Sequence, residues 1–279
     1  MTTLAQEGRL HPLPRPVRSH QRNLNLVREL AITQFKLRYA GSVLGYVWSL
    51  VKPLMLFGIL YLVFVRLLKV KADEFPVQLL LGVVIWNFFT EATSTAVNAI
   101  AGQAGLVRKA YFPRWILVVA STASAMLTFL INLVLVVAVT VAIGHMHLGV
   151  RSLLAPLFLL ELIALIMGLS LLLSSVFVYF RDVGHIWEII SLALFYGSAI
   201  LFPFTIVPAG DRVLRLLIGV NPVAQVVEDL RHAMVVSTAP WMASVLGSLY
   251  AVPILIVVAV FTVGWLTFHR LGSHFAENL

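Results

Sequence analysis

The chain has 279 residues, of which 60% are hydrophobic and only 11% are charged, and its mean hydropathy is +0.97. A soluble domain carries about 25% charged residues, so the composition excludes a soluble domain and indicates an integral membrane protein. The net charge of +8 does not point to nucleic acid, because the basic residues cluster at the ends of apolar runs. The absence of cysteine excludes disulfides, thiolate catalysis and cysteine-ligated metals.

The first segment, residues 1–22, is polar and rich in proline, and we expect a flexible cytoplasmic tail without a cleaved signal peptide. Residues 23–39 follow, with the sequence "NLNLVRELAITQFKLRY". On a helix their apolar residues share one face, opposite Asn25, Glu29 and Lys36: Leu24, Val27, Leu30, Ala31 and Phe35. This pattern predicts an amphipathic helix in the membrane interface. An ordinary helix packed on protein is the alternative.

Residues 40–279 are expected to form a single transmembrane domain of six helices. Crossing the roughly 30 Å hydrocarbon layer takes about 20 residues. Five runs are long enough, and they cover Gly41–Val65, Pro76–Ile100, Ile116–Ile143, Leu153–Phe180 and Met242–Phe268. A sixth and shorter run covers Ile186–Phe204. The sequence therefore predicts an all-α integral membrane protein.

The distribution of basic residues predicts the orientation. With six spans both termini lie on one side, which holds twelve Lys and Arg residues against seven on the other. Lys52, next to Pro53, lies inside the first span. The positive-inside rule places the richer side, and therefore both termini, in the cytoplasm.

The segment between the fifth and sixth spans is expected on the outer side. Its two parts, Asp211–Val220 and Pro222–Val236, are too short and too charged to span the membrane. Asn221 followed by Pro222 is a typical helix start. We therefore predict two short amphipathic helices that dip into or lie upon the outer leaflet, at a gate or pathway mouth.

A basic loop interrupts the apolar sequence between the second and third spans, with the sequence "LVRKAYFPRWIL". Arg108, Lys109 and Arg114 lie within seven positions, and Pro113 is well placed to open the third span. The loop therefore either serves only to orient the protein in the membrane or forms a contact with a cytoplasmic partner.

Several other residues are candidates for packing or function. Gly41 and Gly45 have the G-x-x-x-G spacing that lets helix backbones approach closely, within the chain or against a second copy. Carboxylates within apolar runs are suspects for a channel or an ion pair, and they are Glu91, Glu161 and Glu188. Arg181 and Asp182 are expected to form a local ion pair.

No catalytic or metal site is expected. His145 and His147 are two potential ligands without a third nearby, and Ser, His and Asp have no supporting arrangement.

Nearly the whole chain resembles the ABC-2 type permeases that export polysaccharides such as O-antigen, capsule and teichoic acid. The resemblance is carried by four segments in the right order: "FKLRYAGSVLGYVWSLVKPL", "WNFFTEATSTAVNAIAGQAGLVRKAYFPRWIL", "VYFRDVGHI" and "NPVAQVVEDLRHAM".

The resemblance implies a homodimer of permease chains in the bacterial cytoplasmic (inner) membrane, driven by two copies of an ABC ATPase subunit that binds ATP and Mg. The cargo would be an undecaprenyl-linked glycan, handled among membrane lipids, with no cofactor in this chain. Asn98–Tyr111 resembles the coupling helix that docks on the ATPase, with its candidate contacts at Asn98, Gln103, Leu106, Val107, Arg108, Lys109 and Tyr111. Asn23–Tyr39 resembles the interface helix, with Arg28, Lys36 and Arg38 near the ATPase. Asp211–Val236 resembles the outer gate, with Asp211, Arg212, Asn221, Pro222, Glu228 and Arg231 as its polar residues.

The energy source lies outside this chain. No Gly-Lys pair occurs, so the sequence has no G-x-x-x-x-G-K-[ST] phosphate loop. The alternatives are an ABC-2 exporter of drugs or lipids, a proton-driven carrier that uses Glu161, and a membrane enzyme acting on lipid-linked sugars.

Overall fold

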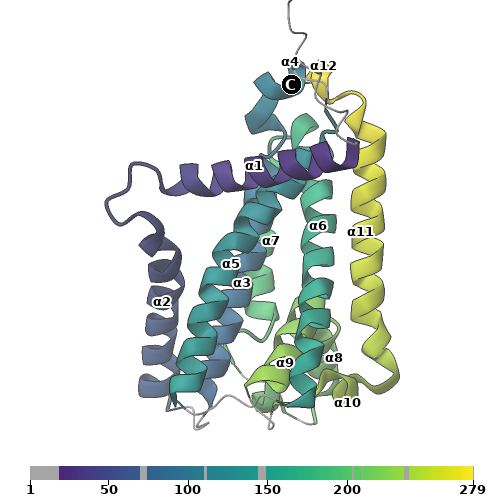
Figure 1. The fold of residues 1–279 in the computed structure, drawn as a ribbon. Coiled ribbons are helices and arrows are strands. Elements are labelled where there is room, and N and C mark those ends of the chain that lie inside the picture. Colours follow the sequence, from purple (N-terminus) through teal and green to yellow (C-terminus); the bar gives the residue numbers. More distant parts are fainter. Residues whose placement is uncertain are drawn as a thin grey trace, which may run out of the picture.

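The computed structural model describes residues 19–69, 74–109, 112–143, 149–202, 204–208, 210–235 and 239–278. Every regular element in these ranges is a helix (Figure 1), which confirms the all-helical membrane fold. Three residues singled out above, Tyr111, His145 and His147, lie outside the described residues, as does most of the predicted N-terminal tail.

Within the described ranges, five helical segments are long and apolar enough to cross a membrane: Gly45–Leu67, Phe75–Val97, Trp115–Ala142, Val150–Tyr179 and Met242–Gly272. Each overlaps one of the five long runs predicted from the sequence. Their main helices are α2 (Trp48–Tyr61), α3 (Phe75–Val97), α5 (Trp115–Ile143), α6 (Ala155–Tyr179) and α11 (Ala251–Gly272). Shorter turns extend them: η1 (Gly45–Val47), η2 (Leu62–Leu67), η4 (Val150–Leu154), α10 (Met242–Leu246) and η6 (Gly247–Tyr250).

The sixth apolar helix differs from its predicted extent. We expected it over Ile186–Phe204, whereas α7 covers Val183–Gly197. Its 15 residues reach only about 22 Å along the axis. The helix ends before Ala199, whose positive φ of 51° is incompatible with a right-handed helix. Residues 198–202 and the short turn η5 (Phe204–Ile206) carry the chain on from there.

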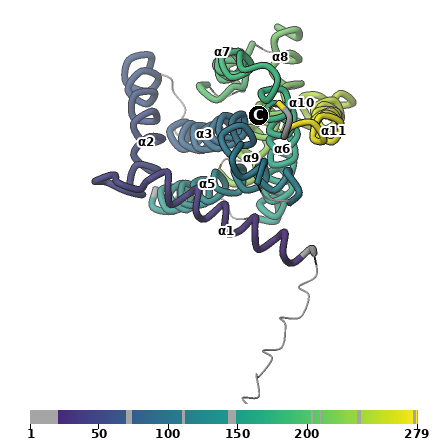
Figure 2. Tube along the Cα trace, turned by 90° about the horizontal axis from the view of Figure 1, so that it is seen from above, coloured from purple at the N-terminus to yellow at the C-terminus, as the bar shows by residue number. Residues whose placement is uncertain are grey.

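α3 forms the centre of the molecule. It is packed against α2, α5, α6, α7 and α9, and most of its residues are buried. Seen along the helix axes, α3 lies inside the group, whereas α2 and α11 lie at its margins (Figure 2). In α2 only Ser49 and Pro53 are buried. The core is thus built around the second span.

The two ends of the bundle carry different accessory helices (Figure 1). At one end lie α1 (Ser19–Tyr39), η3 (Ala101–Gln103), α4 (Ala104–Lys109) and α12 (Phe275–Asn278). At the other end lie α8 (Arg212–Gly219), α9 (Pro222–Met234) and α10. The first and last described helices therefore share one end, as an even number of crossings requires. By the positive-inside prediction that end is cytoplasmic, and we call it so below.

α1 crosses the bundle almost at right angles to the other helices (Figure 1). It begins at Ser19 rather than at Asn23, so residues 19–22 belong to the helix and not to the predicted tail. Ala31 is buried where α1 packs along α5, while Arg28 and Lys36 are exposed. The amphipathic pattern thus gives a helix that packs on protein along one face and leaves Arg28 and Lys36 exposed.

Candidate functional site

The predicted coupling segment forms a compact unit at the cytoplasmic end. Asn98 ends α3, η3 and α4 follow, and the amide of Gly102 donates a hydrogen bond to the Asn98 carbonyl (2.8 Å). The side chain of Asn98 also lies close to Gly102, at 3.3 Å from the position that a Cβ would take. The segment is therefore a direct continuation of the central helix.

A hydrophobic cluster anchors this segment. Val107 is buried in a cluster that includes Ile100, Leu117, Phe268 and Phe275, and α4 contacts α12 near the end of the chain. Arg108 and Lys109, which follow directly, are exposed, whereas Leu106 and Gln103 are partly exposed. The arrangement presents two cations on a firmly held helix, which suits contact with an acidic partner surface.

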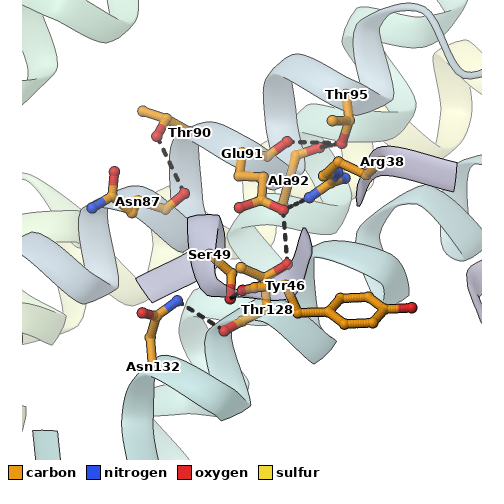
Figure 3. Close-up of polar contacts among 10 residues, drawn as sticks. All are labelled: Arg38, Tyr46, Ser49, Asn87, Thr90, Glu91, Ala92, Thr95, Thr128 and Asn132. Carbon is orange, nitrogen blue, oxygen red and sulfur yellow. Dashed lines mark hydrogen bonds and ion pairs between the residues drawn. The ribbon is translucent and has the colours of Figure 1, made fainter. Parts of the chain in front are cut away.

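A polar cavity of about 410 Å³ lies under α1, between α2, α3 and α5. Arg38 of α1 forms an ion pair with Glu91 of α3, and the Thr128 hydroxyl of α5 donates a hydrogen bond to the same carboxylate (3.1 Å) (Figure 3). Lys52 also lines the cavity. Glu91, one of the carboxylates noted within the apolar runs, thus links α1, α3 and α5 at the cytoplasmic end.

Loss of the Glu91 charge is expected to loosen α1 without unfolding the chain. Both side chains of the pair are about a quarter exposed (25% and 26%), so solvent screens the interaction and its contribution is below about 1 kcal/mol. In the Glu91→Gln variant the α1 amides should exchange with deuterium about two- to fivefold faster. The matched control is Glu188→Gln, whose side chain is 76% exposed beside His185. Equal exchange in α1 of both variants would contradict a role for Glu91 in holding this helix.

The outer end contains a buried network around α9. Asn221 begins this helix by accepting a hydrogen bond from the Val223 amide (3.0 Å), as its sequence predicts. α8 and α9 are the two short helices predicted between the fifth and sixth spans. α9 is not exposed on the surface of the bundle, since nearly all of its residues are buried among α3, α6, α8 and α11. Arg231 and Asp229 of α9 form hydrogen bonds with residues outside their own helix. α8 is more exposed, and Asp211 caps it by accepting from the Leu214 amide (3.0 Å).

Arg231 is the centre of this network. Its side chain is fully buried, pairs with Glu228 (2.5 Å) and donates hydrogen bonds to the carbonyls of Gln78 in α3 and of Ala199 and Ile200 beyond α7 (2.9–3.1 Å). Gly82 leaves room for the guanidinium, since a Cβ there would lie 2.7 Å from Nη2. Arg231 thus satisfies the carbonyls that the early end of α7 leaves without helical partners.

A second group of contacts surrounds Asp229. Its carboxylate accepts hydrogen bonds from Gln225, Tyr250 and the Met242 amide, each at 2.9 Å. Gln225 also donates to Glu161 of α6 (3.4 Å). Burial raises the pKa of Asp229, and this effect outweighs the hydrogen bonds, which lower it. Burial likewise raises the pKa of Glu228 and outweighs the lowering effect of the Arg231 charge.

Gln225, Asp229 and Tyr250 were not among the site residues predicted from the sequence. The available signal was the spacing of polar residues on α9, where positions 225, 228, 229 and 231 follow a proline helix start in an apolar chain.

Two predicted pairings are not made. A Cβ at Gly41 or at Gly45 would meet nothing within 4 Å, and both residues have positive φ (75° and 51°). The pair therefore makes no close helix contact with the described residues, and packing against a second copy stays a prediction. The guanidinium of Arg181 lies over the ring of Phe177 (5.1 Å) and, among the described residues, forms no ion pair with Asp182.

Comparison with known proteins agrees with this architecture. The sequence profile described as "ABC-2 type transporter" matches residues 25–235. The match begins inside α1 and ends just after α9, so it includes the coupling segment and the buried outer network.

Curated relatives extend the similarity over most of the chain. The O-antigen export system permease protein RfbA of Klebsiella pneumoniae is 25% identical over 244 residues, covering 88% of this chain and 91% of the relative. The protein of the same name from Myxococcus xanthus is 23% identical over 265 residues, covering 95% and 99%. The polysialic acid transport protein KpsM of Escherichia coli is 26% identical over 212 residues, covering 75% and 80%.

Proposed function

Because this chain belongs to the ABC-2 type transporter family, we propose that it is the membrane-spanning permease subunit of a polysaccharide exporter. The observation that carries the proposal is the similarity to O-antigen export permeases along 88–95% of the chain. The similarity to the polysialic acid transport protein KpsM favours a glycan cargo over a drug or a free lipid.

The finer features of the proposal concern partners. We infer two permease chains and two copies of an ABC ATPase that binds ATP and Mg, acting on a glycan attached to an undecaprenyl-type carrier in the cytoplasmic membrane. The absence of a phosphate loop supports a separate ATPase. The exposed cations of α4 supply a suitable contact for it. The largely unburied α2 leaves an apolar face for lipid or for a second chain.

α3 is well placed to carry motion from the ATPase to the outer end. Its cytoplasmic end continues into the coupling segment, and Glu91 near that end holds α1. Gln78 near the opposite end accepts a hydrogen bond from Arg231 of α9. The two positions are 13 residues apart, about 20 Å along a helix. A shift of α4 along or around the α3 axis would therefore act on both the interface helix and the buried α9.

Charge reversal of the coupling segment is expected to separate the permease from its ATPase. In the Arg108→Glu/Lys109→Glu variant, two exposed cations become anions while the buried Val107 anchor is kept. Juxtaposed like charges at an interface cost several kcal/mol. We therefore expect an ATPase that co-purifies with the tagged chain to fall by at least about tenfold, with an unchanged amount of chain in the membrane.

The matched control is Arg66→Glu/Lys69→Glu, which reverses two exposed charges at the opposite end of the bundle. Normal glycan export and normal ATPase recovery in the α4 variant would contradict the coupling role. A proton-driven carrier is the second candidate, because Glu161 contacts Gln225 in the same buried group as Asp229. Export that survives ATP depletion and stops with an uncoupler would replace our proposal with this one.

A further inference from the structure

A second cavity at the cytoplasmic end is strongly basic. It has a volume of about 890 Å³, within the range of small-molecule sites, and lies between the first turns of α1, the end of α4, residues 112–115 and the last turns of α11. Arg22, Arg108, Lys109, Arg114 and His269 line it, and none of the described side chains that line it is acidic. We call it the basic cavity.

The cations of the basic cavity are not neutralised within the described part of the chain. The ion pairs found there join Arg38 to Glu91, Arg231 to Glu228 and His185 to Glu188, all outside this cavity. Concentrated positive charge without a partner favours an anionic ligand.

The surroundings of the basic cavity are those of a membrane interface. Phe112, Trp115 and Phe268 also line it, with Phe112 just before α5, Trp115 at the start of α5 and Phe268 in the last turns of α11. Below the cavity the ring of Trp265 stacks on His269 (6.3 Å between centroids), and Trp265 and Leu266 are each nearly half exposed. The cavity thus continues directly onto an open apolar face of α11, at the margin of the bundle (Figure 2).

We propose that the basic cavity binds the phosphate headgroup of an anionic glycerophospholipid of the cytoplasmic leaflet, with the acyl chains lying on α11. Arg and Lys side chains bind phosphate oxygens through charge-assisted hydrogen bonds, and basic pockets beside membrane helices bind anionic headgroups. An acidic protein segment would use the cations but would leave the apolar rim and the exposed α11 face uncovered. The site neighbours α4, so an occupied cavity would hold α1, α4 and α11 together.

The test is lipid binding to the purified full-length chain, followed by native mass spectrometry. Dioleoyl phosphatidylglycerol is titrated against dioleoyl phosphatidylcholine as the neutral reference. The test variant is Arg22→Gln/Arg114→Gln, which leaves Arg108 and Lys109 of the coupling segment intact. The matched control is Arg66→Gln/Arg212→Gln, which removes two exposed arginines at the opposite end of the bundle. Thermal unfolding of each protein verifies that it is folded.

We expect phosphatidylglycerol to bind wild type and control equally, and to bind the test variant about 10- to 30-fold more weakly, since each cation contributes roughly a fivefold factor. Equal binding to all three proteins, or an equal loss in both variants, would overturn the site. Displacement of the lipid by millimolar inorganic phosphate would identify a free phosphate as the ligand and overturn the lipid assignment. Loss of a co-purifying ATPase from the test variant, with lipid binding unchanged, would assign the cations to protein contact. None of these readouts depends on glycan export, so the proposal and the proposed function can fail separately.

Discussion

The Gly264→Ala variant is expected to unfold at a markedly lower temperature than the wild-type chain. α6 and α11 cross at Gly168 and Gly264, where an added Cβ on Gly264 would lie 2.1 Å from the Gly168 carbonyl oxygen. A Cβ on Gly168 would likewise lie 2.6 Å from the Cα of Phe261. These obstacles are backbone atoms, so the two helices would have to separate along a contact that is the most extensive helix pairing in the described chain.

Overpacking typically costs about 1–3 kcal/mol of unfolding free energy. Because two long helices would have to separate, we expect a loss near the upper end of this range, about 3 kcal/mol. Thermal unfolding in one detergent, followed by circular dichroism, measures the effect. Gly58→Ala is the matched control, because Gly58 lies inside α2 with nothing within 4 Å of its Cβ position. Alanine is a better helix former than glycine, so the control should be as stable as wild type or slightly more stable. Similar melting curves for the two variants would mean that the α6–α11 crossing is not as close as described.

Replacement of Arg231 by methionine is expected to have the largest effect on stability in the outer half. The substitution leaves Glu228 buried without its partner and removes the donors to Gln78, Ala199 and Ile200. Removing one member of a buried pair costs about 3–5 kcal/mol. Arg231→Lys keeps the charge but not the planar fork of donors, so it should recover only a small part of this loss.

Two further variants separate the causes. Arg231→Met/Glu228→Met removes both members of the pair and should be less destabilised than Arg231→Met alone, because no buried carboxylate is left unpaired. Arg212→Met removes an exposed arginine from α8 and should behave like wild type. If Arg231→Met and Arg212→Met unfold at the same temperature, the buried network makes no net contribution to stability and α9 is held by its apolar contacts alone.

Several features followed from the sequence because they depend on local pattern. The long apolar runs predicted the five long membrane segments, whose boundaries agree to within a few residues except near Gly45 and Gly247, where shorter turns precede the main helices. Asn221 followed by Pro222 predicted the start of α9, and Asp211 the start of α8. Motif order predicted the family that the profile match over residues 25–235 confirms.

Other features depend on which helices meet, and the sequence predicted them poorly. The G-x-x-x-G spacing at Gly41 and Gly45 suggested close packing, yet the described residues show a close helix crossing at Gly168 and Gly264, which are 96 residues apart. The end of α7 and the buried α9 are linked through Arg231, because its side chain donates hydrogen bonds to the carbonyls of Ala199 and Ile200 just beyond α7. Arg231, which the sequence suggested as a polar residue of the outer gate, is therefore fully buried.

The sequence by itself determined that this protein is a helical membrane permease. Placing charge or unpaired backbone in lipid costs free energy at each position, so the requirement leaves a local pattern in the sequence. It also placed the cations of the coupling segment and the polar helix start of the outer end. Only the tertiary structure decided where those charges go. Arg38 meets Glu91 across 53 positions and Arg231 meets Gln78 across 153, while Arg22 and Arg114 line one cavity. Such pairings are set by helix packing between distant segments, for which a single sequence carries no local signal.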